Sequence, residues 1–189
     1  MGKLVVISGP SGAGKGTVVK ELLNIYKNNN DKVHLSVSVT TRLPRVGEVD
    51  GVNYYFINEK EFLDKIESNK FLEYNKYGTG KYYGTLKEHV LKYLSLGYDV
   101  ILEIDINGYK QVIKNYQDAL GIFIMPPSLE ILEQRLRDRG TETEEQIENR
   151  LKTAKIELDN KDIYPHIVIN YDGKVLDAAK EVYNIIKNK

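Results

Sequence analysis

Residues 4–23 read LVVISGPSGAGKGTVVKELL, and this stretch decides the fold. An apolar, strand-like run over 4–8 leads into the glycine-rich stretch 9–17, and a helical pattern follows. The pattern Gly-x-x-x-x-Gly-Lys between a strand and a helix is the context that a phosphate-binding loop requires. Glycines let backbone N–H groups turn toward a phosphate, and the helix presents the positive end of its dipole to the same anion. The stretch therefore predicts a nucleotide-phosphate site, where Lys15 supplies a mobile charge for the β- and γ-phosphates.

The composition is that of a globular protein with one good-sized core. The chain has 189 residues, of which 41% are hydrophobic and 29% charged, and its formal net charge is zero. These values predict a single domain and exclude a global basic field that would attract nucleic acid. The chain has no cysteine, which excludes disulfides, thiolate catalysis and cysteine-based metal sites, and its three scattered histidines argue against zinc.

The sequence also bears on location. The chain enters its first strand directly, without a signal peptide, and no apolar run approaches the roughly 20 residues needed to span a bilayer. We therefore expect a cytoplasmic protein with no membrane partner.

Apolar strand-like runs alternate with helical patterns along most of the chain. Strands are expected at 4–8, 99–104, 120–125 and 166–170, and helices at 15–26, 108–116, 129–139, 143–158 and 174–187. Continuous apolar runs suit strands that are buried on both faces of a parallel sheet, so the pattern predicts an α/β fold with right-handed crossovers. Thr143 and Gln146 have the spacing of a capping box at the start of the 143–158 helix.

Residues 33–85 break this alternation. Apolar and polar residues alternate over 33–39, which predicts a half-buried strand. A polar loop at 40–48 follows, and then short strand-like pieces at 53–57, 71–77 and 81–83, with a helix near 59–68. The segment is predicted to be a small, mostly antiparallel insertion. Because ligand sites in open α/β sheets lie beyond the carboxyl ends of the strands, the insertion is expected to face the phosphate loop across a cleft.

Two features of the insertion suggest an acceptor site. Arg42 and Arg45 flank Pro44, and two arginines on a stiffened loop suit a fork-like grip on a phosphate, although solvated surface arginines are the alternative. Glu73, if it points into the cleft, accepts hydrogen bonds only. Guanine offers two adjacent donors, N1–H and the 2-amino group, to one carboxylate, whereas adenine does not. An exposed strand glutamate is the alternative for Glu73.

Carboxylates end the strand-like run at 101–105. A two-residue period places Glu103 and Asp105 on one face of that strand. Two buried carboxylates are costly unless they are paired or near a metal. In P-loop enzymes, the acidic residue that ends the neighbouring strand helps to hold the Mg²⁺ shell or the substrate.

Arginines gather near the end of the 129–139 helix and on the helix after it. Arg135 and Arg139 lie four residues apart, and Arg150 follows on the next helix. Like charges at that spacing repel unless an anion or a carboxylate lies between them. A cation at a helix C-terminus is the alternative reading for Arg139. The loop 140–145 is predicted to act as a lid that brings arginines over a transferring phosphoryl group.

Taken together, these segments resemble guanylate kinases over essentially the whole chain. The resemblance rests on the phosphate loop, the block SVSVTTRLPRVGE at 36–48, the run YYG at 82–84, the strand at 101–105 and RGTET at 139–143. It implies a P-loop NTPase-type, three-layer αβα core at 1–32, 86–134 and 159–189. It also implies a small mixed α/β GMP-binding insertion at 33–85 and a helical lid region at 135–158.

The resemblance implies the reaction ATP + GMP ⇌ ADP + GDP with Mg²⁺, in purine nucleotide metabolism and GMP recycling, with dGMP as an expected second acceptor. The implied catalytic residues are Lys15, Arg42, Arg135, Arg139 and Arg150. The implied ATP-binding residues are Gly9, Pro10, Ser11, Gly12, Ala13, Gly14, Lys15, Gly16, Thr17 and Asn170. The implied GMP-binding residues are Ser38, Arg42, Arg45, Tyr54, Glu73, Tyr83, Thr85 and Asp105.

By the same resemblance, magnesium is expected to bind through the ATP phosphates, with Thr17, Glu103 and Asp105 as candidate contacts, partly through water. The chain departs from the usual patterns in two places: Gly16 follows Lys15 where a Ser or Thr is general, and Glu103 stands where Asp is common.

Two other functions stay open, a non-catalytic protein-binding module of the same family and a kinase for another nucleoside monophosphate. A nucleic-acid partner is not expected, and a monomer and a homodimer both remain open.

Overall fold

The larger part of the molecule is a five-stranded parallel sheet in the order β2-β7-β1-β8-β9. The structure is a computed structural model that describes residues 2–78, 80–138, 140 and 143–189. The strands are β1 (Leu4–Ser8), β2 (Val33–Leu35), β7 (Asp99–Glu103), β8 (Leu120–Met125) and β9 (His166–Ile169). β1 is buried along its whole length, as its continuous apolar run predicts for a central strand.

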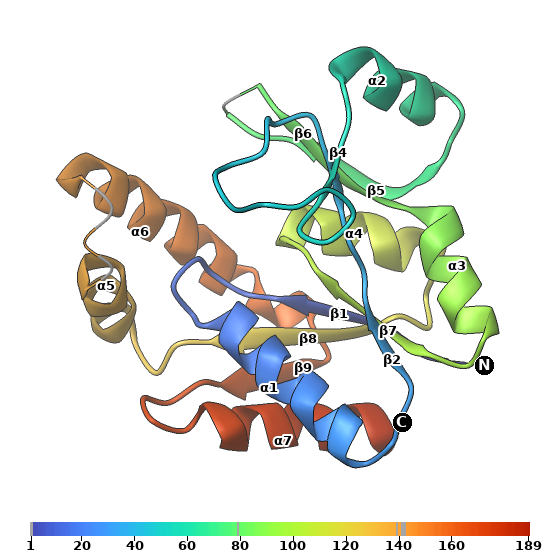
Figure 1. Cartoon of the computed structure of the whole chain (residues 1–189). Helices are drawn as coiled ribbons and strands as arrows, with labels where there is room; N and C mark the ends of the chain where they lie inside the picture. The colour runs from blue at the N-terminus through green and yellow to red at the C-terminus, as the bar shows by residue number, and fades with distance from the viewer. Residues whose placement is uncertain (1, 79, 139, 141–142) are drawn as a thin grey trace.

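Helices cover both faces of this sheet (Figure 1). One face packs against α1 (Lys15–Asn28) and α7 (Val175–Lys187), and the other against α3 (Lys87–Ser95) and α4 (Ile106–Asn115). Alternate residues of β1 enter the two cores: Val5 and Ile7 on the side of α1 and α7, and Leu4 and Val6 on the other. The arrangement has three layers, and the predicted α/β fold class is confirmed.

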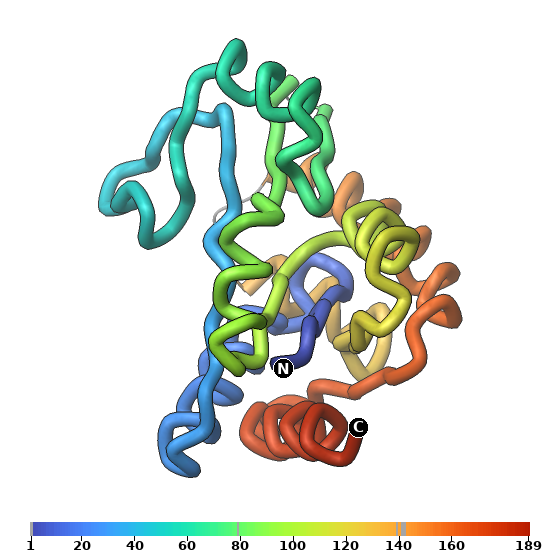
Figure 2. The backbone as a smooth tube through the Cα atoms, turned by 90° about the vertical axis from the view of Figure 1, so that its right-hand side faces the viewer, coloured from blue at the N-terminus to red at the C-terminus, as the bar shows by residue number. Residues whose placement is uncertain are grey.

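A second, four-stranded sheet in the order β4-β3-β6-β5 forms a separate lobe (Figure 2). Its elements are β3 (Val39–Thr40), β4 (Tyr55–Phe56), α2 (Glu59–Glu67), β5 (Phe71–Lys76) and β6 (Tyr82–Leu86). β6 pairs antiparallel with β3 and β5, whereas β3 and β4 are parallel. The lobe has its own small core, in which Phe62 stacks on Phe71 beside Val39 and Leu86.

The alternating stretch 33–39 is not one strand. β2 pairs in parallel with β7 in the larger sheet, and β3 belongs to the smaller one. The insertion, which the sequence places from residue 33, therefore departs from the core only after β2. The alternation is misleading because β2 is an edge strand, and its three residues are only half-buried. Helix α3 has no counterpart among the predicted elements.

Helices α5 (Leu129–Asp138) and α6 (Glu144–Asp159) form a pair beside the glycine-rich loop, and the short 3₁₀ helix η1 (Lys161–Ile163) follows (Figure 1). The predicted capping box is confirmed: Thr143 N donates to Gln146 Oε1 at 2.9 Å, and Gln146 N donates to Thr143 Oγ1 at 3.4 Å. In the part of the chain that the structure describes, every helix is too short or too polar to cross a bilayer.

Tyr26 links α1 to the sheet and to the last helix. Its ring is fully buried, and its hydroxyl donates to Asp99 Oδ2 at 2.9 Å, which also accepts from Lys187 Nζ at 3.2 Å.

We predict that Tyr26→Phe lowers the free energy of unfolding by about 1–2 kcal/mol, because the Asp99 carboxylate loses a buried donor. Urea denaturation measures this loss. Tyr171→Phe, at a ring that is 51% exposed, is the control and should leave stability unchanged, so an equal loss in both variants contradicts the role of the buried hydroxyl.

Candidate active site

The loop at residues 9–17 joins β1 to α1 at the carboxyl edge of the parallel sheet. Gly14 precedes α1 with a left-handed φ of 85°, and a Cβ there would lie 2.4 Å from Asn170 Nδ2, so only glycine fits. Gly14 has no side chain to cap the helix. The first amides of α1 therefore stay available for an anion, as a phosphate site requires.

Lys15 folds back over this loop. Its Nζ donates to Gly9 O at 2.5 Å and to Pro10 O at 3.1 Å. The side chain also lines the neighbouring cleft. The ammonium group is therefore held next to the position where the loop would bind phosphates.

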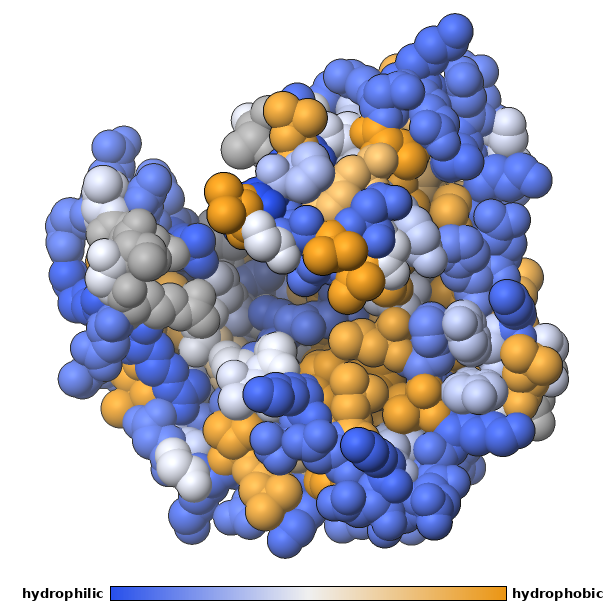
Figure 3. Space-filling model, in the orientation of Figure 1, coloured by the Kyte–Doolittle hydropathy of each residue, from blue (hydrophilic) through white to orange (hydrophobic). Residues whose placement is uncertain are grey.

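A cleft opens between the loop, the insertion and α6. Figure 3 shows this hollow between the two lobes, with polar residues on its floor. The structure brings together nine of the predicted residues in its wall, namely Gly9, Ser11, Lys15, Ser38, Tyr54, Glu73, Tyr83, Glu103 and Asp105. Residues far apart in the sequence thus form one site with a phosphate-binding loop at one end and a buried carboxyl at the other.

Glu73 is the buried carboxyl. It is only 5% exposed, and Thr85 Oγ1 donates to its Oε1 at 2.6 Å. Burial raises the pKa of Glu73 to about 7, and the nearby charge of Asp105 acts in the same direction. A carboxyl in this position keeps acceptor capacity for a donor on a bound molecule.

Arg42 is held in place by a carboxylate and two aromatic rings. Its Nη1 and Nη2 donate to Glu48 at 2.8 and 2.9 Å, and its guanidinium lies 5.4 Å from the Tyr54 ring centre and 5.7 Å from that of Phe56. This pairing lowers the pKa of Glu48 to about 2. Within the described residues, Arg42 Nε is buried and has no hydrogen-bond partner. Glu48 therefore occupies the Nη1–Nη2 edge of the guanidinium, and Leu43 O accepts a further hydrogen bond from Nη1 at 2.7 Å.

Arg45 does not join this group. Its side chain is exposed, and its backbone contacts Glu48: Arg45 N donates to Glu48 Oε2 at 2.7 Å, and Arg45 O accepts from Glu48 N at 3.0 Å. The structure thus brings Arg42 close to Tyr54 at the cleft wall and leaves Arg45 on the outside of the loop.

Asp105 differs from its expected place. The prediction that Glu103 and Asp105 share one strand face is wrong, because β7 ends at Glu103 and Asp105 is the N-cap of α4. Asp105 Oδ1 accepts from Gly108 N at 2.8 Å, and Oδ2 accepts from Asn75 Nδ2 at 3.1 Å and from the Tyr77 hydroxyl at 2.8 Å. Both carboxylates still line the cleft.

A carboxylate next to the loop bears on metal binding. Glu103 Oε1 lies 3.9 Å from where a Cβ on Gly16 would stand, and burial raises its pKa while Lys15 opposes the shift. Across the described ranges, no cluster of three or more His, Cys, Asp or Glu side chains could hold a metal. Mg²⁺ usually takes one or two carboxylates together with substrate phosphates and water. The residues therefore fit an ion held mainly by nucleotide phosphates, with Glu103 as the nearby carboxylate.

A second hollow lies on the other side of the loop and includes Gly12, Gly14, Thr17 and Asn170. Asn170 is buried. Its Nδ2 donates to Ala13 O at 2.9 Å, and its Oδ1 lacks a hydrogen-bond partner within the described residues. Asn170 thus links the segment after β9 to the loop and lines this hollow.

The predicted arginines are divided between the two sides. Arg135 lines the hollow of Asn170, and its Nη2 donates to Asn170 O at 2.8 Å and to Asp172 Oδ1 at 2.5 Å. Arg150 Nη1 donates to Ser11 Oγ of the loop at 2.6 Å. Arg139 lies outside the described residues, as does part of the predicted lid loop. The structure therefore places Arg150 at the phosphate loop and Arg135 on the side of Asn170.

Sequence reasoning missed several polar residues of the site. Asn75 and Tyr77 line the cleft together with Glu73, and their two-residue spacing was the signal that could have found them. Glu157 of α6 also lines the cleft, and burial raises its pKa to about 7, with Lys15 opposing the shift. Its spacing of seven residues from Arg150 indicates a polar stripe along α6. Glu48, which holds Arg42, was quoted only as part of a motif.

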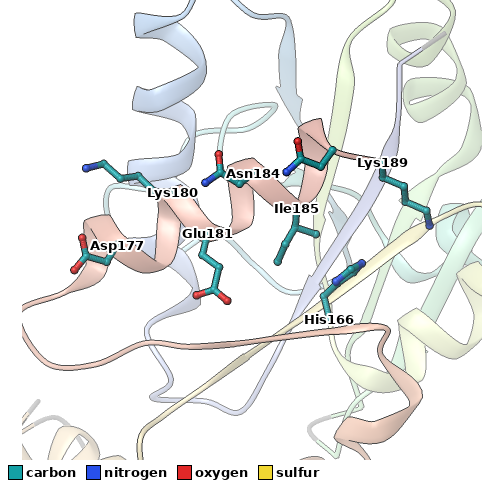
Figure 4. A pocket seen from close by; sticks show the side chains of 8 residues that line it. His166, Asp177, Lys180, Glu181, Asn184, Ile185 and Lys189 are labelled. Carbon is teal, nitrogen blue, oxygen red and sulfur yellow. The ribbon is translucent and has the colours of Figure 1, made fainter.

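A further hollow between α7 and β9 is unrelated to these residues. Figure 4 shows Lys180, Glu181 and Ile185 of α7 and His166 of β9 around it. It includes no residue of the loop at 9–17 or of the insertion. Its location therefore separates it from the phosphate-binding cleft.

Comparisons with known proteins agree with one another. The guanylate kinase family model matches residues 1–189. The chain is 52% identical to a guanylate kinase of Clostridium tetani over 98% of its length and 85% of that protein. It is 46% identical to a guanylate kinase of Rickettsia prowazekii over 98% of this chain and 90% of that protein. The crystal structure of guanylate kinase from Anaplasma phagocytophilum matches with a TM-score of 0.76 at 29% identity, over 99% of this chain and 85% of that one.

The buried Glu73 carboxyl predicts a pH-dependent stability. Its pKa in the folded protein, about 7, lies above the ordinary value of 4.5, so its protonated form stabilises the fold at low pH, and this contribution is lost as pH rises through 7. Glu73→Gln removes the titration. We expect the variant to be more stable than the wild type by at most about 3 kcal/mol at pH 8 and by less than about 1 kcal/mol at pH 5, because pH 5 lies only just above the ordinary pKa of 4.5. Urea unfolding of both proteins at both pH values measures the difference in their free energies of unfolding. A difference that is the same at pH 5 and pH 8 contradicts the raised pKa of Glu73.

Proposed function

The chain belongs to the guanylate kinase family, whose members are nucleoside monophosphate kinases, and we propose that its cleft transfers the γ-phosphoryl group of ATP to GMP. The observation that carries this proposal is the position of Glu73: a buried carboxyl that faces a polar cleft with a phosphate-binding loop at its other end. Such a site suits a nucleotide whose base donates hydrogen bonds and whose phosphate reaches the loop.

Base selection follows from the chemistry of Glu73. Guanine presents N1–H and a 2-amino group to one carboxylate, and Ser38 lines the same cleft. Thr85 orients Glu73 through its hydroxyl. Adenine would leave the buried carboxyl without a donor from the base, at a cost of about 1–3 kcal/mol. The site therefore favours GMP, and dGMP is proposed as a second acceptor because these groups contact the base.

The acceptor phosphate is proposed to bind at Arg42. Its guanidinium lies 5.4 Å from the ring centre of Tyr54, and the rings of Tyr54 and Tyr83, which line the cleft, stand 5.9 Å apart. Arg45 is also proposed to contact this phosphate. Because its side chain is exposed, that contact requires the loop 43–47 to move toward the cleft.

ATP is proposed to bind on the side of the loop, with its phosphates on the backbone amides of residues 9–17 and on Lys15, and its adenine near Asn170. Asn170 Oδ1 supplies an acceptor, and Arg135 holds the segment that carries Asn170. Mg²⁺ bound with ATP would neutralise phosphate charge, and Glu103 is the nearest candidate carboxylate. Thr17 and Asp105 stay candidate contacts of the metal.

The residues perform the transfer by positioning and by charge stabilisation. Lys15 and the loop amides stabilise the donor phosphates while Arg42 orients the acceptor oxygen for in-line attack. Arg150 at Ser11, and Arg139 from the lid, are proposed to stabilise the transferring group. No covalent intermediate is expected. Closure of the lid would exclude water, which would otherwise hydrolyse ATP. The cytoplasmic location and the oligomeric state stay predictions.

A parallel assay of acceptors tests this function. ADP release is measured with ATP, Mg²⁺ and each of GMP, AMP, CMP and UMP. We expect turnover with GMP, and we expect Lys15→Ala to lower kcat by at least about a hundredfold in a folded protein, because the phosphate charge loses its mobile cation. Equal turnover with AMP indicates a different monophosphate kinase, and no turnover with any acceptor indicates a binding module.

The proposed role of Glu73 in selecting the base is tested by a separate substitution. Glu73→Gln presents an amide whose N–H₂ opposes the donors of guanine, so we expect kcat/KM for GMP to fall about tenfold to a hundredfold and the preference for GMP over AMP to shrink. Glu67→Gln, at an exposed position of α2 in the same lobe, is the matched control. Unchanged selectivity in Glu73→Gln removes Glu73 from this role.

A further inference from the structure

β5 is an edge strand of the smaller sheet, and α4 of the larger lobe lies beside it. Gln111 of α4 donates from Nε2 to Tyr74 O at 2.8 Å and accepts from Tyr74 N at 3.1 Å. One side chain thus pairs both backbone groups of an edge residue next to Glu73. Close approach is allowed at Gly108, where a Cβ would lie 2.9 Å from Glu73 Oε2. The insertion and the core are therefore joined along this seam.

Asp105 is the second point of attachment. Its Oδ1 accepts from Gly108 N within the core, and its Oδ2 accepts from two side chains of the insertion, Asn75 at 3.1 Å and Tyr77 at 2.8 Å. An ionised carboxylate has about four lone-pair directions. Three are occupied, so the carboxylate cannot turn freely, and its remaining acceptor capacity has a set direction in the cleft.

Tyr77 also connects this carboxylate to the proposed phosphate wall. Its ring packs edge-on against Tyr83, with centres 5.2 Å apart at 86°. Burial and the charge of Asp105 raise the pKa of the Tyr77 hydroxyl, so it stays a donor at neutral pH. The residue as a whole is 42% exposed, although its hydroxyl contacts Asp105. The bonding pattern, rather than burial, is what distinguishes Tyr77 from a surface tyrosine.

We infer that Asn75 and Tyr77 are positioning residues for the acceptor nucleotide, which hold the Asp105 carboxylate and set the distance between the insertion and the core. Glu73, Asn75 and Tyr77 succeed one another at two-residue spacing along β5 and its end, so one face of this strand carries both the base reader and the two donors that fix Asp105. The inference rests on the proposed function.

The test uses Tyr77→Phe, Asn75→Ala and the double variant in the full chain. Tyr74→Phe is the matched control, because it removes a hydroxyl from the neighbouring position on the opposite face of β5. Two properties are measured. The first is the KM for GMP, which is compared with kcat and with the KM for ATP. The second is the exchange rate of the Gly108 amide hydrogen, which is followed by NMR. The second does not depend on catalysis, because Gly108 N–H is held by Asp105 Oδ1.

In the double variant we expect the KM for GMP to rise about tenfold, with kcat and the KM for ATP within about twofold of the wild type. The Gly108 amide should exchange about tenfold faster, because its acceptor is no longer fixed. Tyr74→Phe should change neither.

An unchanged KM for GMP overturns the positioning role, even where amide exchange accelerates, and so does an equal rise in Tyr74→Phe. If the wild-type protein phosphorylates no acceptor, the proposed function fails. Amide exchange at Gly108 still decides in that case whether the two side chains hold Asp105.

Discussion

The parallel pairing of five strands is the constraint on which the site depends. Parallel strands direct their carboxyl ends to one edge of the sheet. The glycine-rich loop follows β1, Asp105 follows β7 and Asn170 follows β9, so these groups meet although they are far apart in the sequence. The insertion lies above this edge (Figure 1), and its residues line the other wall of the cleft. The core thereby supplies the phosphate end of the site, and the insertion supplies the carboxyl that faces it.

The positively charged side chains of the site already donate hydrogen bonds to other groups of the protein before any nucleotide binds. Lys15 donates to two carbonyls of its own loop, Arg42 to Glu48, Arg135 to Asp172 and Arg150 to Ser11. These bonds hold long side chains near their working positions, which reduces the entropy lost on binding. Binding of phosphate exchanges some of them for stronger, charge-assisted bonds. Arg42 is held at both terminal nitrogens by Glu48, and its Nη1 also donates to Leu43 O.

Much of the core could be predicted from sequence because its strands are continuously apolar. β1 and β8 begin and end where predicted, and the capping box is found at Thr143, also as predicted. The stretch 33–39 could not be assigned, because the alternation of an edge strand in one sheet continues into a strand of another. Lys15, Glu103 and Asp105 were found because a glycine-rich loop and conspicuous charges mark them, whereas Ser38 and Tyr54 came only from the resemblance to guanylate kinases. Asn75 and Tyr77 were missed because their role arises from contact with Asp105, a residue of the other lobe, which no local pattern encodes.

Selection of an acceptor therefore depends on the relation between two lobes as much as on any single side chain. Glu73 belongs to the insertion and Asp105 to the core, and their charges repel, which contributes to the raised pKa of Glu73. Donors from Asn75 and Tyr77 oppose that repulsion by compensating Asp105, and Gln111 joins the same strand to α4. These contacts offset part of the free-energy cost of burying the Glu73 carboxyl. A base that donates hydrogen bonds to Glu73 then supplies its remaining hydrogen-bond partners. Buried polar groups that lack a partner are costly, so under the proposed function this arrangement would favour guanine over a base without those donors.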